Sequence, residues 1–346
     1  MDRGRLIELY RRLAHECVPA KVRLELTRGC NLRCVHCKVA LDNSPENEIT
    51  PAELRRFLPQ LIEAGAFQVN LTGGEIFSRP DIMELLETIF SFDLMVNIQT
   101  NATLIRGEHI ELLKKNIDRV VRIAVSIYAG DPEIHDGVTG VTGSWEKSTR
   151  EFFEMRDAGL EVAAFCLLMK ENSPHWNETK DFFESNKMFY QFASLMVARE
   201  DGCMQPLEHS VPDESLGGLP VEWDRFLNPD PGSIPAAYDG DTRLSEWCVA
   251  ARYPCILPNA DVVPCQVIRR PVGNLRETPF AEIWRGSPLL DEIRALRVRD
   301  LDCRKCEFFP RCKPCIGIAF DESGSFTSRP EAYCKLTHKF MKKETH

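Results

Sequence analysis

The stretch Arg28-Gly29-Cys30-Asn31-Leu32-Arg33-Cys34-Val35-His36-Cys37 determines how the rest of this chain can be interpreted. Its cysteines have the spacing C-x3-C-x2-C and follow an alternating apolar run, Val22, Leu24 and Leu26, that predicts a short strand. Three thiolates can bind three irons of a cubane iron–sulfur cluster and leave the fourth iron open to a small molecule. The motif alone leaves two alternatives, which are reduced cysteines in a loop and part of a zinc site.

Length and composition restrict the classes of protein that this chain can belong to. Its 346 residues suffice for one large domain and a smaller one, and its formal net charge is −9. That charge argues against nucleic acid or an anionic membrane as the main partner, and no apolar run approaches the roughly 20 residues that span a bilayer. The N-terminal segment lacks the apolar centre of a signal peptide, so we expect a cytoplasmic protein with reduced thiols. Fourteen cysteines in that compartment indicate metal binding.

Alternating strands and helices are expected over the first 200 residues. Strands are predicted at 22–27, 67–72, 94–100, 120–127, 161–168 and 191–198, and helices at about 50–64, 80–90, 107–116, 144–158 and 174–186. Thr50 and Glu53 form a capping box at the start of the first helix, and Gly65 ends it. This order predicts an α/β fold with a parallel sheet, open or rolled into part of a barrel. Sites in such folds lie at the C-terminal ends of the strands, where Cys30, Cys34 and Cys37 follow the first strand.

The domain organisation follows from where this alternation stops. We expect an N-terminal amphipathic helix at 1–20, the α/β domain at 21–200, a bridge at 201–246 and a small domain at 247–346. Prolines and glycines interrupt the bridge, which we expect to be partly helical near 221–226. The last segment is expected to contain helices at 279–284 and 288–297. Its low apolar content predicts that metal stabilises it.

Further residues resemble the radical S-adenosylmethionine superfamily. The second predicted strand ends in Thr72-Gly73-Gly74-Glu75, whose glycines permit close approach and whose exposed amides and carboxylate suit an amino-acid ligand. A lone Gly-Gly-Glu is usually a turn, but downstream of the cysteine motif it resembles the family's site for the methionine end of S-adenosylmethionine. The resemblance implies a partial (β/α)6 TIM-like barrel with one [4Fe–4S] cluster at Cys30, Cys34 and Cys37.

The same resemblance implies other contacts with the cofactor. Ser126, at the end of the fourth strand, is expected to reach the ribose or carboxylate, and Asn101 to line the same pocket. His36 is expected to pack beside the adenine. Capping of the strand ends is the alternative for Asn101 and Ser126. Residues 131–144, expected as a loop, resemble the peptide-modifying members, although Thr139 stands where many relatives have arginine.

The C-terminal cysteines resemble a SPASM domain, which carries two auxiliary [4Fe–4S] clusters and would bring the total to three. This resemblance assigns one cluster to Cys248, Cys255, Cys265 and Cys315, and the other to Cys303, Cys306, Cys312 and Cys334. Two departures leave the assignment open: two residues separate Cys312 from Cys315 where three are usual, and Asn259-Ala260 replaces a glycine-containing turn. A four-cysteine zinc site is the alternative.

The combined resemblance implies an enzyme that cleaves S-adenosylmethionine to methionine and a 5′-deoxyadenosyl radical. Fully ligated auxiliary clusters can only carry electrons, which favours an oxidative reaction. The expected substrate is a ribosomally made peptide or protein, which is crosslinked, oxidised or epimerised. Expected partners are a flavodoxin- or ferredoxin-type electron donor and, unless the bridge recognises the peptide, a separate leader-binding protein.

Three alternatives stay open at this point. The substrate of a radical enzyme of this kind can instead be a small molecule such as a sugar, nucleoside or tetrapyrrole. A non-enzymatic, zinc-scaffolded binding protein is a further alternative. Cys203, just past the sixth predicted strand, is a candidate hydrogen-atom donor of the kind that an epimerase requires, or an incidental loop cysteine.

Overall fold

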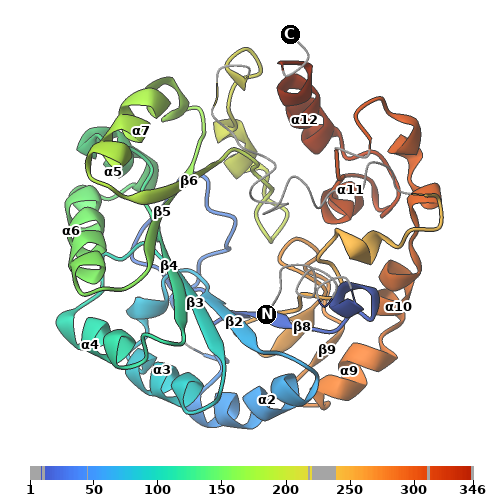
Figure 1. Cartoon of the computed structure of the whole chain (residues 1–346), viewed down its shortest axis with the longest axis horizontal. Helices are drawn as coiled ribbons and strands as arrows, with labels where there is room; N and C mark the ends of the chain where they lie inside the picture. The colour runs from blue at the N-terminus through green and yellow to red at the C-terminus, as the bar shows by residue number, and fades with distance from the viewer. Residues whose placement is uncertain are drawn as a thin grey trace. The chain divides into compact units, whose positions relative to one another are not determined.

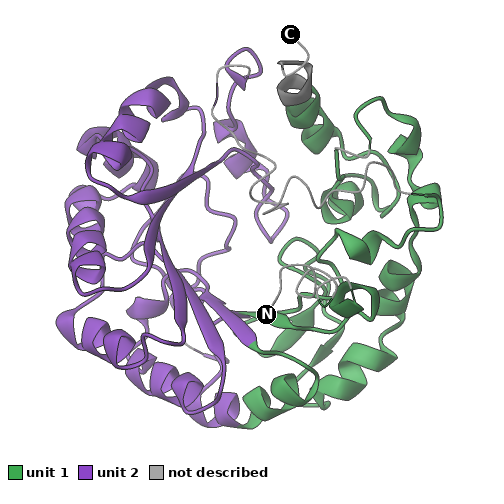
Figure 2. Ribbon diagram, in the orientation of Figure 1, with its two compact units in different colours: residues 1–23, 56–67, 224–346 green, residues 24–55, 68–223 purple. Residues whose placement is uncertain are grey.

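The computed structural model describes residues 9, 12–44, 46–216, 219, 239–309 and 312–343, with backbone alone from 339. These residues form two compact units (Figure 2). We call residues 24–55 and 68–223 the barrel unit, and residues 1–23, 56–67 and 224–346 the C-terminal unit. Half of the predicted N-terminal helix at 1–20 and the whole predicted helical turn at 221–226 lie outside the described residues. The domain boundaries expected from the sequence stay predictions.

Six strands joined by helices build the barrel unit (Figure 1). The strands lie in the order β6-β5-β4-β3-β2-β1, and the pairs from β2 to β6 are parallel. Their bounds are β1 Lys21–Glu25, β2 Gln68–Thr72, β3 Met95–Thr100, β4 Val120–Ser126, β5 Val162–Leu167 and β6 Phe189–Ala193. The helices are α2 Pro51–Glu63, α3 Ile82–Phe90, α4 Gly107–Lys115, α5 Pro132–Thr139, α6 Ser144–Asp157 and α7 Trp176–Ser185. Residues 21–23 of β1 and 56–63 of α2 belong to the C-terminal unit. The predicted α/β class and partial barrel are confirmed.

Apolar burial explains why these segments pair as a parallel sheet. Val96 and Ile98 of β3 and Val125 of β4 are fully buried, as expected for strands that helices cover. Helix α2 begins with the predicted capping box, in which the Glu53 amide donates to Thr50 Oγ1 at 3.2 Å. The chain leaves this helix at Gly65, whose φ of 107° few other residues adopt.

Two local expectations are wrong. The strand predicted at 191–198 is β6, Phe189–Ala193, because the buried Met196 that completed the alternating pattern belongs to a loop. The loop predicted at 131–144 contains α5. Asp131 caps this helix by accepting from the amides of Glu133 and Ile134, and Gly140 ends it in the left-handed conformation. A helix of two turns is too short to show a clear apolar period.

The C-terminal unit contains shorter elements. Its strands β7 (Cys255–Ile256), β8 (Asp261–Val263) and β9 (Gly273–Asn274) pair antiparallel, and its main helices are α9 Phe280–Gly286, α10 Pro288–Ala295, α11 Ile316–Ser323 and α12 Glu331–Lys343. The helices α9 and α10 match the two predicted helices. Trp284 packs in parallel against Phe280, and its indole donates to the Cys17 carbonyl at 3.1 Å. Among the described residues, no helix combines the length and apolarity that crossing a bilayer requires.

Candidate functional site

The cysteine motif lies in the loop that leaves β1 at the C-terminal end of the parallel strands. Burial raises the pKa of Cys30 to about 11 and also raises the pKa values of Cys34 and Cys37. The nearby Cys37 contributes to the raised pKa of both other thiols. The structure therefore brings the three predicted ligands together in one half-buried group. Charging three adjacent half-buried thiols is costly without a cation, so this donor set fits an iron–sulfur cluster.

The two glycines that follow β2 pack against the backbone of this loop. The Gly74 amide donates to the Thr27 carbonyl and the Glu75 amide to the Gly29 carbonyl, each at 2.8 Å. A Cβ on Gly73 would lie 2.4 Å from the Thr27 oxygen, and one on Gly74 would lie 2.2 Å from the Gly29 oxygen. The expectation that the amides of Gly74 and Glu75 are exposed is wrong, because both amides bind the loop that carries Cys30. The glycines are required for this close contact.

Glu75 is fully buried between the ends of β2 and β3. Its carboxylate accepts from the Thr100 hydroxyl at 2.8 Å, the Asn101 amide at 2.7 Å and the Phe77 amide at 3.0 Å. Burial raises the pKa of Glu75, while these donors favour its charged form. Glu75 therefore joins two strand ends beneath the cysteine loop, and its contact with a methionine ammonium stays a prediction.

Asn101 connects the end of β3 to the first cysteine. Its amide nitrogen donates to Asn31 Oδ1 at 3.1 Å and lies 3.9 Å from Cys30 Sγ. Its side-chain Oδ1 accepts from the Thr103 backbone amide at 2.9 Å, which fixes the orientation of the side chain. Asn101 thus lies beside the predicted cluster, and its place in the cofactor pocket stays a prediction.

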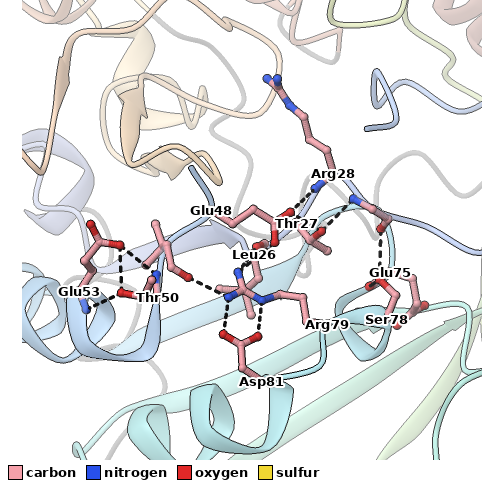
Figure 3. A network of polar contacts seen from close by, with 12 residues as sticks. Leu26, Thr27, Arg28, Glu48, Thr50, Glu53, Glu75, Ser78, Arg79 and Asp81 are labelled. Carbon is pink, nitrogen blue, oxygen red and sulfur yellow. Dashed lines mark hydrogen bonds and ion pairs between the residues drawn. The ribbon is translucent and has the colours of Figure 1, made fainter. Parts of the chain in front are cut away.

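A buried ion-pair network, which the sequence analysis missed, holds the base of the loop (Figure 3). Arg79 donates to the Leu26 carbonyl at 2.6 Å and forms ion pairs with Asp81 at 2.7 Å and Glu48 at 3.3 Å. Glu48 in turn accepts from the Thr27 hydroxyl at 2.5 Å. Nothing in the sequence distinguishes Arg79 from an exposed arginine, because the groups that bury it come from distant segments.

Tyr128 packs beneath the second cysteine. Its phenol lies near the side chains of Cys34 and Ser126, and its ring centre lies 4.8 Å from the His36 ring in an edge-on arrangement. Burial, and then the nearby His209, lower the pKa of His36 to about 4, so its imidazole is neutral near pH 7. The structure thus places His36 and Ser126 at the cysteine loop, and their contacts with adenine and ribose stay predictions.

Glu200, which follows β6, binds the C-terminal end of the cysteine loop. Its carboxylate accepts from the Ala40 amide at 3.1 Å and lies 3.3 Å from the Arg28 guanidinium. Its own amide donates to the Lys38 carbonyl at 2.9 Å. The cysteine loop is therefore held from the ends of β2, β3 and β6.

Cys203 lies in the turn next to Glu200. Its carbonyl accepts from the Arg199 amide at 2.9 Å. The hydrogen bond to Asp201 is the main cause of the raised pKa of Arg199, and the nearby sulfurs of Cys203 and Cys37 add to it. Cys203 and Cys37 thus both lie within electrostatic range of Arg199, and the role of Cys203 as a hydrogen-atom donor stays a prediction.

A histidine–carboxylate pair also lies beside the loop. Glu171 follows β5, and His209 ends the 3-10 helix η3, Gln205–His209. The His209 Nδ1 and Glu171 Oε1 atoms are 2.5 Å apart. The sequence analysis missed this pair, since 38 residues separate its members.

In the C-terminal unit, one group of thiols contains three of the four predicted ligands of the first auxiliary cluster. Burial raises the pKa of Cys248 to about 12, and the nearby Cys315 and Cys265 raise it further. The Cys265 sulfur accepts from two backbone amides at 3.4 Å each. The fourth predicted ligand, Cys255, is buried on β7, with its sulfur 3.9 Å from an Arg269 nitrogen.

The other predicted quartet forms a second group. Burial raises the pKa of Cys312 to about 12, with further contributions from Cys334, Cys303 and Cys306. In the described part of the chain, no three acidic, cysteine or histidine side chains converge on a single ion. A [4Fe–4S] cluster instead distributes its ligands over separate irons, and buried groups made only of sulfur suit such clusters.

Comparison with known proteins identifies the protein family to which this chain is similar. Residues 24–183 match the radical SAM superfamily, and residues 248–315 match SPASM, an iron–sulfur cluster-binding domain. The AdoMet-dependent heme synthase of Methanosarcina barkeri is 25% identical over 91% of this chain and 96% of its own length. The mycofactocin maturase MftC of Mycobacterium tuberculosis is 24% identical over 96% of this chain and 87% of its own.

A solved structure shares the fold. The structure of native anSMEcpe with bound AdoMet and Cp18Cys peptide superposes with a TM-score of 0.69, at 16% identity, over 94% of this chain and 96% of that one. The motif, the fold and both domain matches lead to the same family. The chain is a radical SAM enzyme with a C-terminal SPASM domain.

Proposed function

We propose that this enzyme modifies a ribosomally made peptide or protein by radical chemistry, with crosslinking, oxidation or epimerisation as the outcome. The observation that carries the radical chemistry is the half-buried group of Cys30, Cys34 and Cys37 at the C-terminal strand ends. When bound there, a [4Fe–4S] cluster and S-adenosylmethionine supply a 5′-deoxyadenosyl radical, which abstracts a hydrogen atom from the substrate.

The barrel unit's own residues would orient the cofactor and exclude water. Asn101 and Ser126 offer polar atoms at neighbouring strand ends, next to Cys30 and Tyr128 respectively. Tyr128, Val138, Met169 and Met196 form a buried apolar cluster against which Cys34 and Val35 pack. A water-excluding wall of this kind protects a reactive intermediate from side reactions.

Two auxiliary clusters in the SPASM domain complete the proposal. The first would use Cys248, Cys255, Cys265 and Cys315, and the second Cys303, Cys306, Cys312 and Cys334. Cys315 and Cys265 contribute to the raised pKa of Cys248, and the other three members of the second set contribute to the raised pKa of Cys312. The members of each set that affect one another in this way lie close together, which supports these assignments. Eight cysteines leave no iron open to substrate, which favours an oxidative reaction. A flavodoxin- or ferredoxin-type protein would donate the initiating electron, and a separate leader-binding protein could present the peptide.

The maturase relative MftC supports a peptide substrate, since its similarity extends over nearly the whole chain. The test is an anaerobic assay of the reconstituted enzyme with S-adenosylmethionine, reductant and candidate precursor peptides, followed by mass spectrometry. We expect 5′-deoxyadenosine and a peptide that has lost hydrogen or, in heavy water, gained deuterium. The Cys30/Cys34/Cys37→Ala variant should form neither. If every peptide stays unmodified while a small molecule is converted, the peptide proposal is wrong.

The same assay tests Cys203. If the reaction is an epimerisation, Cys203→Ala should still form 5′-deoxyadenosine but should lose deuterium incorporation into the peptide. Cys166→Ala is the matched control, because Cys166 is fully buried on β5. An unchanged deuterium content in Cys203→Ala would show that this thiol is an incidental loop cysteine.

A tetrapyrrole substrate is the second candidate. The observation that favours it is the similarity to a heme synthase over 91% of this chain. An anaerobic assay with porphyrin precursors, followed by absorption spectroscopy, separates the two candidates. Formation of a new tetrapyrrole chromophore, dependent on Cys30, Cys34 and Cys37, would favour this candidate over the peptide.

A further inference from the structure

Helix α12 brings Cys334 and two further polar side chains, Thr337 and His338, to the second group of thiols. Cys334 and His338 are four residues apart on this helix and therefore lie on the same face. The Thr337 hydroxyl, on the neighbouring position, donates to the Tyr333 carbonyl at 2.9 Å, and its side chain lies near Cys312. The His338 Nε2 atom lies 3.5 Å from the Cys306 sulfur. Helix α12 thus contributes one member of this cysteine quartet, Cys334, and places side chains next to two others, Cys306 and Cys312.

Packing fixes the His338 imidazole in this position. Its ring stands edge-on to Phe308, with the ring centres 4.7 Å apart and an interplanar angle of 63°. Phe308 is buried, and its carbonyl accepts from the Cys312 amide at 2.7 Å. The aromatic ring that supports His338 therefore belongs to the segment between Cys306 and Cys312, so the histidine and this cysteine segment are positioned together.

We propose that His338 donates a hydrogen bond from Nε2 to the Cys306 sulfur and thereby raises the reduction potential of the second auxiliary cluster. A donor at a ligating sulfur stabilises the reduced cluster, which carries the additional negative charge. Four thiolates already supply one ligand for each iron, so the histidine acts through Cys306 as a positioning residue. The inference rests on the proposed function in one respect, since it requires a cluster at these four cysteines.

Individual sulfurs of the two auxiliary groups differ in their hydrogen-bond partners. The Cys265 sulfur of the first group accepts from the backbone amides of Val267 and Ile268. The Cys306 sulfur of the second group is contacted by the His338 side chain. A substitution can remove the side-chain donor without altering the backbone, so the potential of one cluster can be changed while the other serves as an internal reference.

The test is a redox titration of the Cys30/Cys34/Cys37→Ala variant, monitored by electron paramagnetic resonance, which observes the auxiliary clusters alone. His338→Phe should shift the one-electron equilibrium of one cluster by about tenfold towards the oxidised form, which corresponds to about 59 mV. His338→Gln, which keeps a donor, should restore part of the shift. His15→Phe, at an exposed histidine of the same unit, should change neither potential.

The iron content of each variant shows which part of the proposal is wrong if the expected shift in potential is not observed. The proposal expects His338→Phe to retain all of the iron that the parent variant binds. If iron is lost, His338 is a ligand and the hydrogen-bond proposal is overturned. Unchanged iron with unchanged potentials overturns it as well. If the parent variant binds no iron at the C-terminal cysteines, the proposed auxiliary clusters are wrong, and this inference is overturned with them.

Discussion

The cysteine loop of the barrel unit and the cysteine groups of the C-terminal unit are held by different means. Around the loop, the amides of Gly74 and Glu75 and the side chains of Arg79 and Glu200 bind backbone atoms of residues 26–40. In the C-terminal unit, the cysteines lie on strands of two or three residues, on short turns and at the ends of helices. Few regular hydrogen bonds are available in such short elements.

This difference indicates which sulfurs can be positioned without metal. The barrel unit fixes its loop through the strand ends of a parallel sheet, so its cysteines should keep their arrangement when iron is absent. The C-terminal groups combine short elements with thiols such as Cys248 and Cys312, whose pKa values are raised by burial and by neighbouring thiols. We expect these groups to depend on bound metal for their structure, as small cysteine-rich domains commonly do.

Removal of metal should have the largest effect and tests the comparison directly. After anaerobic chelation, amide hydrogen exchange should accelerate strongly at residues 248–334, because the bound metal contributes to folding there. Residues 24–37 should keep most of their protection. Equal loss of protection in both regions would show that the barrel loop also needs its cluster in order to fold.

Arg79→Met should destabilise the barrel unit by about 3–5 kcal/mol, because it leaves the buried Glu48 carboxylate without its cation. The measurement is urea unfolding followed by tryptophan fluorescence. Lys114→Met is the matched control, since Lys114 pairs with Glu111 at an exposed site. Its effect should stay within about 0.5 kcal/mol. A similar small effect of Arg79→Met would remove the network from this account.

Gly74→Ala should cost about 3 kcal/mol, because its Cβ would meet the Gly29 carbonyl oxygen, a backbone atom that cannot rotate away. We also expect loss of the iron bound at Cys30, measured by iron analysis. Gly107→Ala is the control, as nothing lies within 4 Å of its Cβ position at the start of α4. Wild-type iron content in Gly74→Ala would contradict a direct coupling between this glycine and the loop.

The smallest effect concerns His135, which is fully buried and whose Nδ1 accepts from the Tyr128 amide. Burial lowers its pKa from 6.5 to about 4, so the unfolded chain binds more protons between these values. Stability should therefore rise with pH from about 4 to 6.5 and be lost as the pH falls through this window.

The measurement for His135 compares unfolding at pH 7 and pH 5. His135→Asn keeps an acceptor but removes the titration, so the wild type should lose about 1–2 kcal/mol more than the variant between these two pH values. An identical pH dependence in both proteins would mean that His135 titrates normally.

The sequence was sufficient to predict the elements with strong local signals. The capping box at Thr50, the alternating strands and the cysteine spacing each depend on neighbouring residues, and the structure has all three. The partners of Glu75 and Arg79 and the contacts of Tyr128 could not be predicted, because distant segments bring those groups together. Helix α5 was missed because it is too short to show a clear apolar period. The bounds of β6 were wrong because the alternating apolar pattern continues into a buried loop.

The most direct test of the central claim is the iron and sulfide content of anaerobically reconstituted protein, for the wild type and the Cys30/Cys34/Cys37→Ala variant. We predict about twelve irons in the wild type and eight in the variant, which corresponds to one reactive and two auxiliary cubanes. Zinc in place of iron at the C-terminal cysteines, or equal iron in both proteins, would contradict the account.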